Sequence, residues 1–384
     1  MLNPITYTER VVGDFLRYQL TTYPLADPGL HDQMRRLLNL EATRATPLLK
    51  GPYISLSRSF RRGARLSDLV EQGVLHPHLP NLAPHPHLYG HQETAIRAIA
   101  GGRTTLVSTG TGSGKTECFL YPIISRCLTL RDEGAPAGIV AVIVYPMNAL
   151  AEDQLGRLRE LLAGTGVSFG MYIGKTPERT EDVPGIRLPS GASRPDYLRS
   201  VETARREKQP HAVHPPEERI ARDEMRTPGK QPRILLTNVK QLELLLTRQK
   251  DIDLFDCSRL EFVVFDEAHT FSGVAGAETA CLIRRLRAYC GRVPTETACV
   301  ATSATIVDPE RGPGAGRDFA ARFFGVPPET VTLVGEEYEP DVWTSGRKLP
   351  GPLPGDPAVQ LRTVLDAVGG VESGGPAEAA VRES

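Results

Sequence analysis

Ser108-Thr109-Gly110-Thr111-Gly112-Ser113-Gly114-Lys115-Thr116 is the stretch that decides the fold of this chain. It follows a short apolar run, Thr104 to Ser108, and precedes a helical pattern, Glu117 to Leu128, which predicts a strand, a loop and a helix in that order. The three glycines allow backbone conformations that a Cβ would forbid, so that successive N–H groups can converge on an anion. The partial positive charge of the helix N-terminus favours the same ligand. The stretch therefore predicts a phosphate-binding loop.

The side chains of the loop indicate a nucleoside triphosphate with magnesium as its ligand. Lys115 can reach the β- and γ-phosphates, and the hydroxyl of Thr116 can bind Mg²⁺. The loop departs from the general pattern at Thr109, where a glycine is expected. A turn rich in glycine and serine is the alternative, but it does not explain the lysine and the hydroxyl. The residues expected to bind ATP are Thr109, Gly110, Thr111, Gly112, Ser113, Gly114, Lys115 and Thr116.

A second motif follows the apolar run Leu260 to Phe265, which predicts a buried parallel strand. Asp266-Glu267-Ala268-His269 comes next, and open α/β sheets bind ligands at the carboxyl ends of such strands. We expect Asp266 to hold Mg²⁺ and Glu267 to polarise the attacking water, because phosphoryl transfer depends on positioning and charge. Alone, the four residues could form the acidic first turn of a helix. Beside the loop, the catalytic interpretation is favoured.

Together the two motifs resemble those of the superfamily 2 nucleic-acid helicases with a DEAH-type box. Leu88-Tyr89-Gly90-His91-Gln92 resembles their adenine-reading Q motif, which implies that Gln92 hydrogen-bonds the adenine and that Tyr89 stacks on it. Ala301-Thr302-Ser303-Ala304-Thr305 resembles the motif that couples hydrolysis to movement. The resemblance implies coupling roles for His269, Ser303 and Thr305.

Two further segments resemble motifs with which these helicases hold a nucleic-acid strand: Tyr145 to Gln154 (motif Ia) and Leu235 to Asn238 (motif Ib). Taken singly, each could be an ordinary turn from strand to helix. Their order and their place at strand ends favour the helicase interpretation. Main-chain N–H groups and short polar side chains would then position a strand without reading its sequence. The residues implied in these contacts are Pro146, Asn148, Thr237 and Asn238.

The residues of these motifs are similar to those of the bacterial Lhr-like and mitomycin-repair helicases, and to those of the DISARM phage-defence helicase. The resemblance covers roughly Leu88 to Val334. It implies a RecA-like α/β lobe with a mostly parallel sheet, and ATP and Mg²⁺ as cofactors. It favours DNA over RNA as the partner, with repair or defence proteins as further candidates.

Composition bounds the class of protein. The chain has 384 residues, is 40% hydrophobic and 24% charged, and carries a formal net charge of −1. A soluble globular protein fits these values, and any nucleic-acid binding must use local groups rather than a general basic field. The six cysteines lack metal-ligand spacing, and neither a secretory signal nor a membrane span is recognisable. We expect a cytoplasmic protein without a membrane partner.

The organisation along the chain predicts three parts. Residues 1–80 are expected to form a helical N-terminal extension, residues 81–334 the RecA-like ATP-binding domain, and residues 335–384 a linker and flexible tail. Within the domain, residues 176–230 are rich in charge and proline, which indicates a partly ordered surface insertion or a loop that contacts DNA. No second motor lobe is recognisable, so we expect a truncated or split product, or a second lobe from another polypeptide.

Two functions stay open on the sequence alone. The first is an enzyme, a DNA-dependent ATPase that translocates or unwinds. The second is a module that binds ATP and nucleic acid with little turnover by itself. A P-loop kinase or a transporter ATPase is disfavoured, because neither combines this loop with Gln92, the Asp-Glu-Ala-His stretch and the Ser-Ala-Thr stretch.

Overall fold

The computed structural model describes residues 25–38, 58–110, 112–208, 212–304 and 313–340, together with scattered positions between residues 7 and 22. Thr111 and Thr305, both expected at the site, lie outside the described residues. The chain divides into two compact units. One, formed by residues 1–58 and 340–384, contains helix α2 (Pro28–Leu38), whose first turn is capped by Asp27. The other unit spans residues 59–339.

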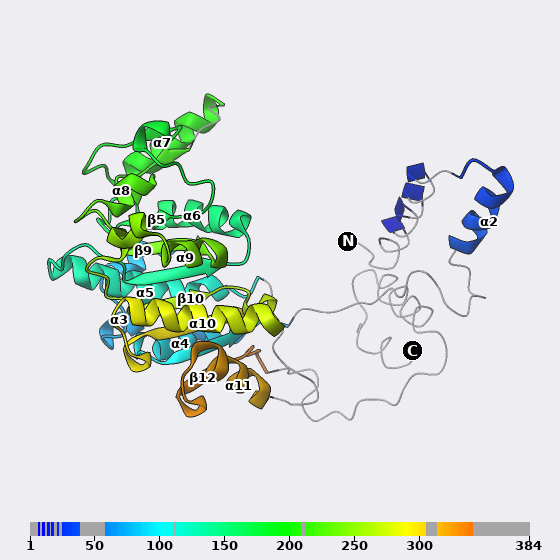
Figure 1. Cartoon of the computed structure of the whole chain (residues 1–384). Helices are drawn as coiled ribbons and strands as arrows, with labels where there is room; N and C mark the ends of the chain where they lie inside the picture. Colours follow the sequence, from blue (N-terminus) through cyan, green and yellow to red (C-terminus); the bar gives the residue numbers. More distant parts are fainter. Residues whose placement is uncertain are drawn as a thin grey trace, which may run out of the picture. The chain divides into compact units, whose positions relative to one another are not determined.

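An eight-stranded sheet forms the centre of the unit 59–339 (Figure 1). Its order is β12-β3-β11-β10-β4-β9-β5-β8, and all neighbouring strands pair in parallel. This confirms the predicted α/β class with a RecA-like parallel sheet. The strands are β3 (Thr104–Ser108), β4 (Ala141–Tyr145), β5 (Phe169–Met171), β8 (Glu218–Arg219), β9 (Ile234–Asn238), β10 (Phe262–Phe265), β11 (Ala298–Ser303) and β12 (Val331–Val334).

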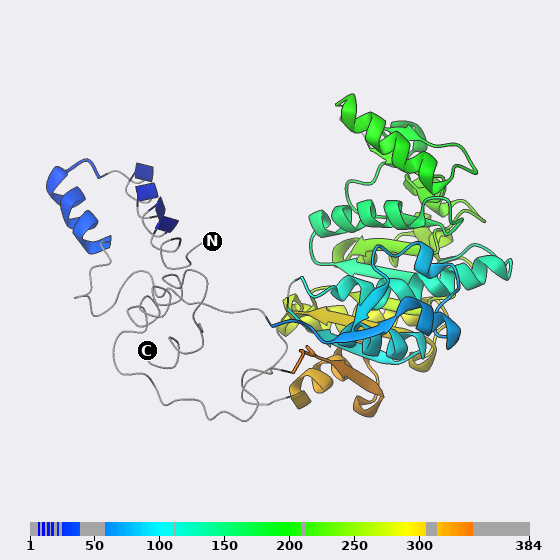
Figure 2. The ribbon, with the colours of Figure 1, turned by 180° about the vertical axis from the view of Figure 1, so that it is seen from behind.

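Helices cover both faces of the sheet, as the opposite views of Figures 1 and 2 show. One face is covered by α3 (Leu66–Glu71), α4 (Gly90–Ala100), α5 (Lys115–Asp132) and α6 (Asn148–Leu162), and the other by α9 (Val239–Leu245), α10 (Gly273–Tyr289) and α11 (Pro313–Phe324). Each face of the sheet forms a hydrophobic core with the helices that cover it. Successive side chains of a strand point to opposite faces, so Ile143 lies in the core under α4 and α5, and Val142 lies in the core under α9 and α10. Strands buried on both sides therefore read as continuous apolar runs. No described helix is long and apolar enough to cross a bilayer.

The unit 59–339 begins earlier than the boundary expected at residue 81. Strand β1 (Arg62–Arg65) pairs antiparallel with β2 (His87–Tyr89), next to the start of α4. Leu66 and Leu69 of α3 are buried in the same core as α4 and α5. These leucines are shielded from water because they pack against that core. Residues 59–80 therefore fold with the unit and do not form a separate extension.

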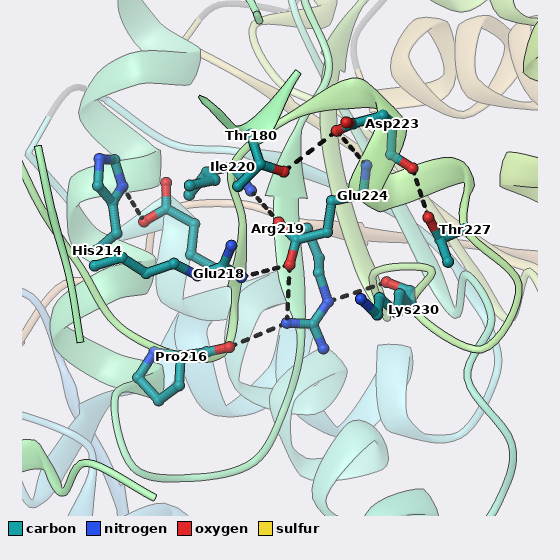
Figure 3. A network of polar contacts seen from close by, with 11 residues as sticks. Thr180, His214, Pro216, Glu218, Arg219, Ile220, Asp223, Glu224, Thr227 and Lys230 are labelled. Atoms are coloured by element: carbon teal, nitrogen blue, oxygen red, sulfur yellow. Dashed lines mark hydrogen bonds and ion pairs between the residues drawn. The ribbon is translucent and has the colours of Figure 1, made fainter. Parts of the chain in front are cut away.

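The charged segment 176–230 also differs from the expected surface insertion. It contains β6 (Ile186–Arg187), α7 (Arg194–Arg206), β7 (Val213–His214) and α8 (Arg222–Arg226), and its β8 is the edge strand of the main sheet. In both views α7 lies at the β8 end of the sheet (Figures 1 and 2). Some charged side chains of this segment pair with one another, as do Arg219 and Glu224 at 4.0 Å in the polar network of Figure 3.

One buried ion pair fastens this segment to the core. The guanidinium of Arg159, on α6, donates two hydrogen bonds of 2.7 Å to the Glu218 carboxylate. His214 Nδ1 lies 3.0 Å from the same carboxylate (Figure 3). A buried charge is tolerated only when its hydrogen bonds are satisfied. An apolar cluster of Tyr197, Ala204 and Val213 with Ala163 packs the same segment against the end of α6.

Candidate nucleotide site and nucleic-acid face

The predicted phosphate-binding loop connects β3 to α5 at the carboxyl edge of the sheet. Gly112 and Gly114 have φ angles of +80° and +76°, in the region that glycine adopts most readily. Lys115 Nζ donates to the carbonyl oxygen of Thr109 at 3.0 Å and lies 3.8 Å from Glu267 Oε1. The ammonium group therefore has one hydrogen bond to a neutral carbonyl and one long ion pair, and phosphate oxygens can replace both.

Thr109, the departure from the usual loop pattern, stabilises the loop from within. Its hydroxyl is buried and shares a hydrogen bond of 2.7 Å with the hydroxyl of Ser113. Ser113 Oγ also lies within hydrogen-bonding distance, 2.9 Å, of the Gly110 carbonyl oxygen. A threonine at this position thus closes the loop through its side chain.

Strands β10 and β11 bring the acidic stretch and the Ser-Ala-Thr stretch side by side. The hydroxyl of Thr302 donates to the carboxylate of Asp266 and accepts the N–H of Glu267 at 3.1 Å. His269 Nδ1 lies 3.3 Å from Glu267 Oε2 and 3.3 Å from Ser303 Oγ. Except for Thr305, which lies outside the described residues, the predicted catalytic and coupling residues therefore form one connected network. Thr302 was missed, although its place inside the Ser-Ala-Thr stretch was a usable signal.

The acidic stretch combines a partly buried carboxylate with an uncommon backbone conformation. Burial raises the pKa of Asp266, and the neighbouring Glu267 carboxylate adds to this, although the hydrogen bond from Thr302 opposes it. Glu267 itself has φ +50°, an uncommon backbone conformation for a residue with a Cβ. A divalent cation would favour the ionised form of Asp266. The hydroxyl of Thr116 and the carboxylate of Asp266 are hard oxygen donors of the kind that Mg²⁺ prefers, so these residues fit it.

Helix α4 begins within the predicted Q motif and lies against the loop. Gln92 uses both ends of its amide inside the protein: Oε1 accepts the Tyr89 N–H at 2.9 Å, and Nε2 donates to the Gly114 carbonyl oxygen at 3.0 Å. Tyr89 is 41% exposed. Both side chains line a hollow of about 540 Å³ that Gly112 and Gly114 also line. The hollow is a candidate site for the base, and Gln92 would have to exchange a partner to read it.

The predicted nucleic-acid residues lie beside one another, with one exception. Asn238 Nδ2 donates to Asn148 Oδ1 at 2.7 Å, which joins the start of α9 to the start of α6. Together with Pro146 they line a groove of about 770 Å³ that continues between α9 and α10. Thr237 is buried, and its hydroxyl donates to the Tyr172 carbonyl oxygen at 2.7 Å. The expectation for the Thr237 side chain is therefore corrected: it belongs to the core and not to the groove.

Glu336 contacts the phosphate-binding loop from the chain that follows β12. Its Oε1 accepts the Gly110 N–H at 2.6 Å, and its other oxygen accepts the hydroxyl of Tyr338. The hydrogen bond from Tyr338, and to a smaller extent that from Gly110, lowers the pKa of Glu336. No sequence motif signalled this contact, because the two residues are 226 positions apart.

Comparisons with known proteins identify a family and several similar chains. The family model for the DEAD/DEAH box helicases matches residues 89–187 and 203–311. The chain is similar to the Druantia protein DruE of Escherichia coli (strain UMEA 4076-1), with 28% identity covering 79% of this chain and 20% of DruE. It is similar to the uncharacterized ATP-dependent helicase YprA of Bacillus subtilis (strain 168), with 27% identity covering 58% of this chain and 23% of YprA.

Solved structures include similar chains as well. The DUF1998 helicase MrfA bound to DNA has 22% identity and a TM-score of 0.47, covering 72% of this chain and 29% of MrfA. The Mycobacterium smegmatis helicase Lhr bound to ssDNA and AMP-PNP has 23% identity and a TM-score of 0.44, covering 68% of this chain and 28% of Lhr. This chain spans only about a fifth of the length of the curated relatives DruE and YprA.

Proposed function

Because the chain belongs to the DEAD/DEAH box helicase family, we propose that the unit 59–339 is the ATP-binding lobe of an ATP-driven nucleic-acid translocase or helicase. One observation carries the proposal. The network of Lys115, Glu267, His269 and Ser303 joins the phosphate-binding loop to the ends of β10 and β11. A nucleotide placed on the loop would contact one end of this network directly.

The chain's own residues divide the chemistry among them. Lys115 binds the β- and γ-phosphates as a point charge, and Thr116 and Asp266 would hold Mg²⁺, which neutralises phosphate charge when bound. Glu267 orients and polarises the attacking water. Its carboxylate lies between the Lys115 ammonium and the His269 ring, so a change at the phosphates alters its partners. His269 and Ser303 would pass that change to β11, the neighbour of β3 in the sheet.

The groove lined by Pro146, Asn148 and Asn238 is the proposed nucleic-acid face. Helix α6 starts there, and no side chain of its N-cap residue Met147 caps its first N–H groups, which suit phosphate oxygens. Contacts of this kind hold a backbone without reading bases. We therefore propose sequence-tolerant binding that weakens with salt, with DNA as the preferred track.

A second candidate is a module that binds ATP and nucleic acid but turns over little by itself. Phosphoryl transfer in related enzymes gains about 10³-fold or more from an arginine directed at the phosphates. The arginines of α10 are engaged elsewhere. Arg284 Nη2 donates to the Arg322 carbonyl oxygen at 2.9 Å, and Arg287 donates to that of Phe324. Both hold α10 against α11, so an arginine for the phosphates would have to come from another part of the protein or from a partner.

An ATPase assay with and without single-stranded DNA or RNA tests both candidates. Turnover that rises with one nucleic acid supports the enzyme and identifies its track. Nucleotide and oligonucleotide binding with no stimulated turnover supports the module, which an added second lobe should activate. Failure to bind any nucleotide in a fluorescent-nucleotide titration would refute both.

A further inference from the structure

Two consecutive residues at the start of α4 hold two consecutive carbonyl groups of the phosphate-binding loop. His91 is fully buried, and its Nε2 lies 2.8 Å from the carbonyl oxygen of Ser113. Gln92 Nε2 donates to the carbonyl oxygen of Gly114 at 3.0 Å. In a planar trans peptide the C=O and the N–H point in opposite directions. A Ser113 carbonyl held towards α4 therefore turns the Gly114 N–H away from α4.

The protonation of His91 follows from this contact. A carbonyl oxygen can only accept, so Nε2 must carry a proton and donate it to Ser113. Nδ1 is buried and has no hydrogen-bond partner among the described residues. The ring packs at 5.1 Å from Phe60 and is stacked at 5.7 Å on Tyr89. Burial lowers the pKa of His91, which favours the neutral ring with its single donor directed at the loop.

Glycine makes such a support necessary. Gly114 adopts φ +76°, which is strained for a residue with a Cβ, and a Cβ there would also push Gln92 Nε2 from its place. A glycine is also free to adopt many other conformations, and its peptide units can rotate at little cost. An external hydrogen bond removes that freedom before the ligand arrives, which improves binding because less ordering remains to be done.

We propose that His91 is a positioning residue for the phosphate-binding loop. Its hydrogen bond to Ser113 fixes the peptide unit between Ser113 and Gly114, so that the Gly114 N–H is presented to a phosphate group of the nucleotide. The proposal deepens the proposed function and rests on it, since it requires that this loop bind a nucleoside di- or triphosphate. His91 would thus affect the binding of the phosphates, whereas Tyr89 and Gln92 line the hollow that is the candidate site for the base.

The test is the substitution His91→Phe, which keeps an aromatic ring in contact with Phe60 and Tyr89 but removes the donor. Affinity for ADP should fall about three- to tenfold, as expected for the loss of one hydrogen bond. Affinity for adenosine, measured by competition, should stay unchanged because adenosine has no phosphate. His91→Gln, whose amide can place a donor near the position of Nε2, should restore most of the ADP affinity.

His214→Phe is the matched control. His214 is also buried, and its Nε2 lies 3.3 Å from the carbonyl oxygen of Pro184, but it lies in the segment 176–230. This substitution should lower thermal stability without changing ADP affinity. His91→Asn, with an amide too short to reach Ser113, is a second variant without the donor in case His91→Phe does not fold.

Wild-type ADP affinity in the folded donor-free variants would overturn the proposal, as would an equal loss of ADP and adenosine affinity. If the unchanged chain bound neither ADP nor ATP, the proposed function would fail, and this inference with it.

Discussion

Two carboxylates have pKa values that shift in opposite directions. Asp266 lies at the carboxyl edge of the sheet beside the phosphate-binding loop, which we call the nucleotide edge, and Glu218 lies in the segment 176–230. Burial alone would raise the pKa of Glu218, but its hydrogen bonds with His214 and Arg159 lower the pKa below its ordinary value. Burial raises the pKa of Asp266, and although the hydrogen bond from Thr302 and the charge of Lys115 oppose this, no cationic side chain among the described residues forms an ion pair with it. Glu218 is satisfied by its own chain and contributes structure. A bound cation would compensate the Asp266 carboxylate directly.

The largest expected effect is that of Glu267→Gln. If Glu267 polarises the attacking water, its loss should lower turnover by about 10²- to 10⁴-fold while ATP affinity changes little. The measurement is steady-state ATPase activity alongside a nucleotide titration, on a preparation that turns over. A parallel loss of affinity and activity would place Glu267 with Glu218, among the residues that maintain structure.

Arg159→Met tests the other side of the comparison. Removing one partner of a buried ion pair leaves the Glu218 carboxylate with His214 as its remaining partner in this network and should cost about 3–5 kcal/mol of stability. Urea unfolding at neutral pH measures the loss. Arg199→Met is the control, because the Arg199–Asp196 pair is exposed and such pairs contribute about 0–1 kcal/mol. Equal destabilisation by both substitutions would mean that the buried network has no special role.

Much of the nucleotide edge could be predicted from local sequence. The apolar runs before Thr109 and Asp266 predict parallel strands, and the carboxyl ends of parallel strands share one edge, so motifs far apart in the chain had to meet there. Thr237 could have been placed correctly by the same reasoning. It is two residues from Leu235, which lies in the α9–α10 core, and a period of two puts both on that face.

The remaining contacts could not be predicted in this way. Strand β8 has only two residues, Glu218 and Arg219, which carry no apolar alternation. Its place at the sheet edge depends on Arg159, 59 positions away. The contact of Glu336 with Gly110 is likewise set by the path of the chain after β12. Contacts of this kind between polar residues leave no periodic pattern in a single sequence.

Lys115→Ala tests whether the nucleotide edge binds phosphate as proposed. Removing a charge-assisted contact worth about 1.5–3 kcal/mol should weaken ATP binding by roughly one to two orders of magnitude. A fluorescent-nucleotide titration measures this. Lys175→Ala is the control, since the Lys175 side chain is exposed and pairs with Glu152 on the surface. Unchanged ATP affinity in Lys115→Ala would contradict the assignment of the loop.

The smallest expected effect is a pH dependence of stability that originates at Glu218. Because the folded protein lowers the pKa of this carboxyl, its contribution is complete above the ordinary pKa of glutamate and is lost as pH falls through the lowered value. Glu218→Gln removes the titrating group, so the variant should be less stable than the wild type at pH 7. The difference should narrow on acidification, because the wild type then loses the same charge. Urea unfolding at pH 7 and near pH 4 measures it, with Glu243→Gln as control, since Glu243 forms only a surface pair with Arg285. A difference that stays constant with pH would show that Glu218 stabilises the segment through its shape and neutral hydrogen bonds, and the contrast with Asp266 would then no longer be one of charge.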